Sequence, residues 1–159
     1  MIICNATPLI TFARIGRLDL LQEVVSSIVI PTAVEREISD YAHIKSGVIE
    51  LSQHPWITVE AVANIKQVQL LLPTLDQGEA EVIALAIERN AHLVLIDELA
   101  GRQVAQSLGL IITGSVGILI RAKQVGKIKW IKPFLNDMTQ QGIHFSSRFI
   151  AQVLQSVGE

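Results

Sequence analysis

The sequence predicts an α/β fold, a single-domain three-layer α/β/α sandwich in which a short parallel sheet lies between two layers of helices. Three observations predict it. The chain has 159 residues, which is the size of one ordinary domain. Half of the residues are hydrophobic, which supports a core and excludes intrinsic disorder. Short apolar runs alternate with amphipathic segments of helix length, as in a parallel sheet covered on both faces.

The first third of the chain predicts two strands and three helices. Residues 1–4 form an apolar strand, and Thr7 then acts as an N-cap with Pro8 at the first helical position. The remaining elements of this part are a helix to Gly16, a helix at 18–25, a strand at 28–30 and a helix that Pro31 opens. Residues 42–54 are expected to be helical.

The rest of the chain continues the alternation. A short strand at 57–59 and a helix at 62–72 precede Pro73. The clearest unit follows: helix 77–90, strand 93–96, helix 98–108 and strand 110–112. Further helices are expected at 115–124, 131–140 and 146–157. The crossovers between parallel strands should be right-handed.

Composition excludes several classes of protein. The single cysteine, Cys4, rules out an intramolecular disulfide scaffold and a cysteine-based zinc cluster. The longest uncharged run, residues 103–120, contains polar residues and three glycines, so it is interpreted as helix, strand and helix rather than a membrane span. No signal peptide is recognised at the N-terminus, and a cytoplasmic protein without membrane contact is expected.

The net charge of −2 conceals an asymmetry. Residues 1–100 carry 6 Lys/Arg and 13 Asp/Glu, whereas residues 101–159 carry 7 Lys/Arg and 2 Asp/Glu. An acidic part beside a basic part suits a metal-dependent enzyme that acts on a polyanion. Two differently solvated surfaces would give the same asymmetry, and charge alone does not separate these interpretations.

Polar residues follow three of the predicted strands. Asn5 follows the first, Asp97 and Glu98 follow strand 93–96, and Thr113 and Ser115 follow strand 110–112. Ligands of open parallel sheets bind beyond the carboxyl ends of the strands, so these residues are candidates for a site. Asp97 alone could equally be the N-cap of the next helix.

Helical geometry separates the other acids. Glu79 lies on the stripe of its helix that is expected to be buried, whereas Glu81 lies on the opposite side. A capping box with Asp76 is an alternative role for Glu79, and both roles can hold at once. Glu37 lies on the flank of its helix's apolar face, and Glu35 is expected to be solvated.

Carboxylates that converge in one crevice repel one another and raise each other's pKa. A hard cation relieves that repulsion. Mg²⁺ or Mn²⁺ takes oxygen ligands, usually keeps several waters and suits phosphate substrates. The pattern therefore predicts a divalent-metal site.

The sequence resembles the PIN-domain nucleases, which include the toxins of VapBC-type toxin–antitoxin pairs. The resemblance covers about residues 1–130 and rests on the order and spacing of five motifs. They are NATPLI (5–10), IPTAVEREI (30–38), LDQGEAEVIALA (75–86), LIDELAGRQVA (95–105) and TGSVGIL (113–119). The resemblance implies a parallel sheet between helices, an acidic pocket for Mg²⁺ or Mn²⁺, and metal-dependent hydrolysis of phosphodiesters, usually in RNA.

Carried over by motif, Glu37 matches the family's helix Glu, Asp97 the acid after the fourth strand, and Glu79 the third acidic position, for which Glu81 competes. The first acid is normally Asp, and Asn5 replaces it here. Thr7 matches the hydroxyl residue two positions later. Thr113 and Ser115 are expected to orient ligands or phosphate, with Glu98 in a supporting role. Phosphate-backbone contacts are expected from Arg102, Arg121, Lys123 and Lys127.

Three functions follow in order. The first is a metal-dependent endoribonuclease, the toxin of a pair with a small antitoxin protein; the partners would be RNA and the antitoxin, and a homodimer is compatible with this hypothesis. The second is a binding module in which Asn5 marks lost metal chemistry. The third is a phosphoacceptor receiver domain, which would need an acidic pair after the first strand; Asn5 with Ala6 does not supply it.

Overall fold

The computed structural model describes residues 1–42 and 47–159 and confirms the predicted α/β architecture. One parallel sheet contains five strands in the order β3-β2-β1-β4-β5. The strands are β1 (Ile2–Cys4), β2 (Ile28–Pro31), β3 (Ile57–Glu60), β4 (Leu93–Leu95) and β5 (Ile112–Thr113). The three inner strands, β1, β2 and β4, are mostly buried, as strands covered on both faces are, whereas the edge strands β3 and β5 are more exposed.

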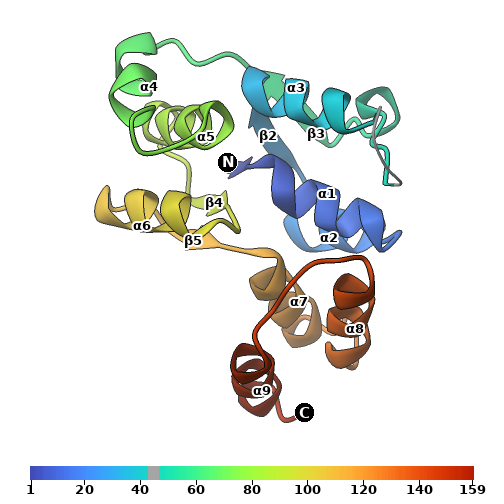
Figure 1. Ribbon diagram of the computed structural model, residues 1–159. Coiled ribbons are helices and arrows are strands. Elements are labelled where there is room, and N and C mark those ends of the chain that lie inside the picture. Colours follow the sequence, from blue (N-terminus) through green and yellow to red (C-terminus); the bar gives the residue numbers. More distant parts are fainter. Residues whose placement is uncertain (43–46) are drawn as a thin grey trace.

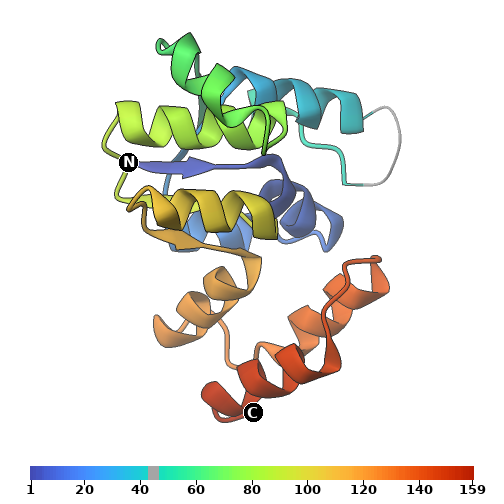
Figure 2. The ribbon, with the colours of Figure 1, turned by 60° about the vertical axis from the view of Figure 1, so that its left-hand side comes forward.

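Helices cover both faces of the sheet. The helices are α1 (Ala6–Arg14), α2 (Leu18–Val25), α3 (Thr32–Tyr41), α4 (Ile65–Leu71), α5 (Gln77–Glu88), α6 (Leu99–Ser107), α7 (Ser115–Gln124), α8 (Lys132–Gln140) and α9 (Ser147–Ser156). In Figure 2, strand β1 is seen between α5 above it and α6 below it, and α3 lies next to α5. In Figure 1, α7, α8 and α9 gather together below the sheet. Among the described helices, none combines the length and apolar character that a membrane crossing requires.

The core forms around the sheet and extends into the C-terminal helices. Fully buried side chains such as Ile3, Phe12 and Leu95 belong to one large cluster, which also includes Leu135 from α8 and Val153 from α9. A smaller cluster fills the space between α4, α5 and α6. The last two helices are therefore part of the same packed body as the sheet.

The structure corrects the predicted start of the first helix. The N-cap position belongs to Asn5, whose backbone is extended, and the helix begins at Ala6 rather than after Thr7. The Thr7 hydroxyl does not cap the helix; it donates a hydrogen bond to Glu98 Oε1 instead. Pro8 still lies in the first turn, where its missing N–H costs nothing.

Two further predictions are modified. The last strand lies at Ile112–Thr113, later than predicted, because Thr113 pairs with Leu95. The predicted helix over 42–54 lies partly outside the described residues. Within them, residues 47–50 have no regular structure, and Leu51–Gln53 forms one 3₁₀ turn, η1.

Candidate metal and nucleic-acid site

The site lies where the strand order reverses. β1 pairs with β2 on one side and β4 on the other, and the chain crosses from β3 to β4 before it continues to β5. The carboxyl ends of β1 and β4 are therefore neighbours at the switch point of the sheet, the usual ligand position in this architecture. The Asn5 N–H donates to the Leu95 carbonyl at 2.9 Å, which fixes Asn5 beside the chain that leads into Asp97 and Glu98.

Asn5 is the centre of the site. The residue is 3% exposed, and its Nδ2 donates to Glu98 Oε2 at 3.1 Å. Its Oδ1 is buried and has no hydrogen-bond partner among the described residues. A buried acceptor without a donor is uncommon and needs an explanation, such as a bound water or ion. The orphaned oxygen is thus the first indication of a missing ligand.

Gly78 opens the space in front of that oxygen. A Cβ added at Gly78 would overlap Glu37 Oε1 and would lie 3.4 Å from Asn5 Oδ1. Glycine at the start of α5 therefore lets the Glu37 carboxylate from α3 approach the Asn5 carboxamide. Glu37 Oε1 and Asn5 Oδ1 therefore both lie next to the Cα of Gly78, in the space that a side chain would fill.

Glu37 carries the strongest electrostatic signal. Burial of its carboxylate, with the negative charges of Asp76, Glu98 and Glu79 nearby, raises the pKa of Glu37 to about 7. Glu37 as a residue is exposed, so its carboxylate is partly accessible from solvent, whereas Glu35, which was expected to be solvated, is half-buried. Four acids from three segments of the chain therefore converge at this point.

Glu79 forms the predicted capping box with Asp76, and it is buried as its position on the helix predicted. Its backbone N–H binds Asp76 Oδ1 at 2.8 Å, and its Oε2 accepts from the Asp76 N–H at 3.1 Å, completing a capping box. The residue is only 6% exposed. Burial raises the pKa of Glu79, the Asp76 N–H opposes that rise, and the charges of Asp76 and Glu98 add to it.

Asp97 faces the other side of the strand end. Its Oδ1 accepts from the Ser115 N–H at 2.7 Å and its Oδ2 from the Ser115 hydroxyl at 2.6 Å, so it caps α7 rather than α6. Burial raises the pKa of Asp97, partly offset by the two Ser115 hydrogen bonds. Arg102 lies close by, because a Cβ added at Gly114 would lie 2.6 Å from Asp97 Oδ1 and 3.0 Å from Arg102 Nη1.

Other predicted residues have different positions. Glu81 Oε2 accepts from the Ala33 N–H at 2.9 Å, so this carboxylate lies at the start of α3. Glu81 is not among the acids that raise the pKa of Glu37. The Thr113 hydroxyl lies against α7, where a Cβ on Gly117 would overlap it.

The predicted basic residues divide into two groups. Arg102 donates to the Ile96 carbonyl at 2.9 Å and stays beside Asp97. Arg121 is exposed on α7. Lys123 binds the Val157 carbonyl at 2.8 Å and Glu159 at 2.9 Å, and Lys127 pairs with Glu23 at 3.2 Å. The last two amines are already engaged within the protein.

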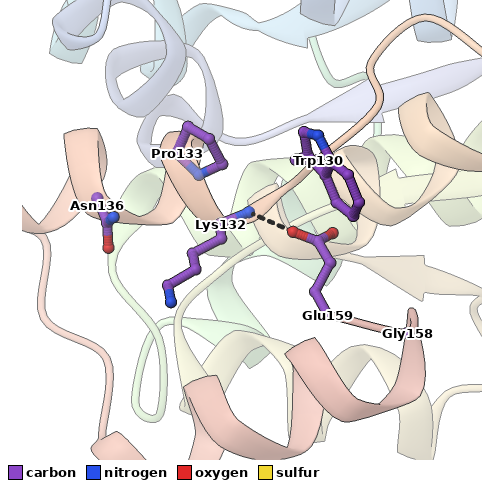
Figure 3. Close-up of a pocket in the computed structure, with 6 residues that line it drawn as sticks. All are labelled: Trp130, Lys132, Pro133, Asn136, Gly158 and Glu159. Atoms are coloured by element: carbon purple, nitrogen blue, oxygen red, sulfur yellow. Dashed lines mark hydrogen bonds between the residues drawn. The ribbon is translucent and has the colours of Figure 1, made fainter.

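A hollow near those lysines is separate from the acids. Figure 3 shows Glu159 inside it, where a hydrogen bond from the Lys132 N–H reaches the Glu159 carboxylate. The Ile131 N–H also donates to Glu159. Both donors belong to the start of α8, so Glu159 caps this helix, and the hollow shares no lining residue with the carboxylate site.

A cleft of about 560 Å³ opens beside Asp97. Thr7, Asp97 and Arg102 line one part of it, and Phe145 and Phe149 line another. The two phenylalanines were not expected from the sequence to belong to a site, and Asp76 was expected only as a helix cap and not as one of the charges around Glu37. The four-residue spacing of Phe145 and Phe149, next to His144, could have indicated an aromatic surface. The segment lies where a loop enters α9, so hydrophobic periodicity did not predict which way the two rings point.

The donor set fits a hard divalent ion. Carboxylate and carboxamide oxygens are the ligands that Mg²⁺ and Mn²⁺ prefer, and the orphaned Asn5 Oδ1 with the raised pKa of Glu37 indicates uncompensated negative charge. No three His, Cys, Asp or Glu side chains of the described residues form a ready cluster for an ion. Two of the acids accept hydrogen bonds from protein donors: Glu98 from Thr7 and Asn5, and Asp97 from Ser115.

Comparison with known proteins identifies a family. A family model described as a PIN domain matches residues 1–159, which includes the C-terminal helices. Neither the curated proteins nor the solved structures contain a match.

Proposed function

The chain belongs to the PIN-domain family, and from that premise we propose that it is a divalent-metal-dependent endoribonuclease. The observation that supports the proposal is the group of polar side chains at the switch point of the sheet. Asn5 binds Glu98 and shares the space next to Gly78 with the Glu37 carboxylate, and the charges of Glu79 and Glu98 act on Glu37. Negative charge gathered in one crevice is unfavourable unless a cation shares it.

The proposed roles follow from the contacts. Asn5, Glu37, Glu79 and Asp97 would hold Mg²⁺ or Mn²⁺, directly or through water. Such an ion, when bound, activates water and neutralises charge on a phosphodiester. Glu98 orients the Asn5 carboxamide and the Thr7 hydroxyl, and Ser115 orients Asp97. Arg102, beside Asp97, supplies positive charge for the RNA backbone.

Single-stranded RNA carrying an end label tests this function. We expect cleavage that rises with Mn²⁺ or Mg²⁺ and stops with chelator. Glu37→Gln and Glu98→Gln should each lower cleavage by about 10²-fold or more, in line with the loss of a charge-stabilising group. Glu35→Gln, on the same helix as Glu37, should cleave like wild type. Cleavage that survives chelation, or that Glu37→Gln retains in full, would refute the proposal.

Asn5 supports one alternative. It is a neutral residue where the family usually has Asp, so the chain could retain RNA binding and have lost hydrolysis. In that case the wild type binds labelled RNA in a salt-dependent manner, and no divalent ion produces cleavage. Restored cleavage in Asn5→Asp would then identify a nuclease inactivated at this position.

The cellular role that we propose is that of a cytoplasmic toxin held in check by a small antitoxin. The support is the resemblance of the sequence motifs. A short reading frame next to this one that encodes a small basic or ribbon-helix-like protein would agree with it. Co-purification of the two proteins, with inhibition of RNA cleavage, is the direct test; a co-expressed neighbour that neither binds nor inhibits would count against it.

A further inference from the structure

The cleft beside Asp97 has features that the hydrolysis of a phosphodiester does not require. Its walls come from α1, α6, β5, α7 and the C-terminal segment 143–153. Much of the lining is apolar, including Ile112, Val116, Ile120 and Val153. A pocket of about 560 Å³ with an apolar lining and a few polar groups has the size and character of a small-ligand site.

An aromatic pair stands at the C-terminal wall. The rings of Phe145 and Phe149 lie 6.0 Å apart at an interplanar angle of 30°, and Phe149 is 40% exposed. Because Phe149 belongs to the first turn of α9, whose N-cap Ser146 accepts from the Phe149 N–H, its backbone is held in place. An exposed ring on a fixed backbone is a stacking surface for another flat ring.

Polar groups, among them Thr7, Asp97 and Arg102, also line the cleft. Arg102 is held by the Ile96 carbonyl through one nitrogen, which leaves further guanidinium N–H groups as donors. The cleft is also continuous with the acids, because Asp97 lines it and Thr7, another lining residue, donates to Glu98. A substrate whose phosphate lies at the acids would therefore place its adjoining group in the cleft.

We propose that this cleft binds one unpaired nucleobase of the RNA substrate, next to the scissile phosphate, with Phe149 as the stacking residue. The free guanidinium N–H groups of Arg102 contact the adjoining phosphate. The inference rests on the proposed nuclease function. A base can enter only from a single strand, because a paired base is stacked between neighbours. The enzyme would accordingly select single-stranded RNA at this nucleotide.

The test is a coupling experiment between the protein and the RNA. A labelled single-stranded oligonucleotide is prepared with one abasic ribonucleotide, placed in turn at each position around the cleavage site, and kcat/KM is measured in Mn²⁺. For wild type, one position should show a loss of about fivefold or more when the base is absent, the low end of the range for base stacking because Phe149 is partly exposed. In Phe149→Leu the intact RNA should show a similar loss, and removal of the base should cost nothing more.

The control variant is Phe134→Leu, the same chemical change on α8 at a ring that contacts Arg17 and does not line the cleft. It should retain the full abasic effect. Circular dichroism and thermal denaturation establish that each variant folds. The loss in Phe149→Leu should appear mainly in KM, since the ring binds the base and does not touch the reacting phosphate.

The outcomes separate the two proposals. If wild type cleaves RNA and the abasic effect is the same in wild type and Phe149→Leu, the base site is wrong and the nuclease function stands. An equal abasic effect in wild type and Phe149→Leu is also expected if the cleft binds a peptide of a protein partner instead of a nucleobase. If wild type neither binds nor cleaves RNA, both proposals fail together.

Discussion

Replacement of Glu37 by glutamine should stabilise the protein in the absence of divalent ions. The pKa of Glu37 is raised from 4.5 to about 7, mainly by burial and then by Asp76, Glu98 and Glu79. At about 1.36 kcal/mol per pKa unit, that shift corresponds to at most about 3.4 kcal/mol. Since Glu37 is partly exposed, solvent screening reduces the effect to about 1–2 kcal/mol.

The sign of the effect depends on pH. Between about pH 4.5 and 7 the folded protein holds the Glu37 proton while the unfolded chain has released it, so the free energy of unfolding falls as pH rises through this window. Glu37→Gln lacks this titration. With chelator present, wild type and variant should therefore be equally stable near pH 4.5, and the variant should be more stable at pH 8.

Thermal denaturation in EDTA from pH 4.5 to 8 measures the difference. A gain of 1–2 kcal/mol corresponds to roughly 2–8 °C in Tm for a chain of this size. Glu35→Gln is the control, because Glu35 lies on the same helix and is not among the charges that act on Glu37. Saturating Mn²⁺ should reverse the order at pH 8, because the variant loses a ligand. A Tm difference between wild type and Glu37→Gln that stays constant from pH 4.5 to 8 would show that Glu37 lies outside any acidic pocket.

Four other predictions concern the same region. Asn5→Asp removes a carboxamide donor and adds a charge, so Tm should fall in chelator and rise in saturating Mn²⁺; an effect independent of metal would contradict the placement of the site. Gly78→Ala inserts a methyl group against the Glu37 carboxylate, so calorimetry should show a weaker Mn²⁺-induced rise in Tm with the fold retained. Glu81→Gln should lower Tm by weakening the cap of α3 yet leave the Mn²⁺ effect intact; loss of that effect would make Glu81 the third acid. Arg102→Ala should reduce the salt dependence of RNA binding by about one phosphate contact, whereas Lys123→Ala should lower Tm and leave that slope unchanged.

The fold was accessible from the sequence because its signals are local. Apolar runs such as residues 93–96 and the amphipathic periodicity of α5 each specify one element, and the alternation of such elements specifies the parallel sheet. Helix phase also predicted that Glu79 would face inward, and the structure buries it to 6% exposure. The capping box with Asp76 followed from the same three-residue spacing.

The parts that sequence reasoning missed depend on turns and long-range contacts. Periodicity ends where β4 ends, so it could not determine that Asp97 would bind Ser115 while Glu98 turns toward Asn5. The partners of Lys123 lie more than thirty residues away, at Val157 and Glu159. The sequence suggested that the charge of Lys123 would contact phosphate. In the structure its amine binds the C-terminal residues Val157 and Glu159.

The carboxamide of Asn5 explains how the acidic site remains assembled. An aspartate at this position would place a carboxylate against Glu98 and Glu37 with no donor between them. Asn5 instead donates to Glu98 through Nδ2 and presents only a neutral oxygen toward Glu37. One like-charge contact is thereby replaced by a hydrogen bond to a charged acceptor, which contributes roughly 1.5–3 kcal/mol. The carboxamide also brings one negative charge fewer than an aspartate would, so a cation at the proposed metal site should be held more weakly than it would be with Asp at this position. Replacement of Asn5 by Asp should therefore raise metal affinity and lower the stability of the metal-free protein. For this reason, Asn5 is the position at which a nuclease and a binding module are most directly distinguished.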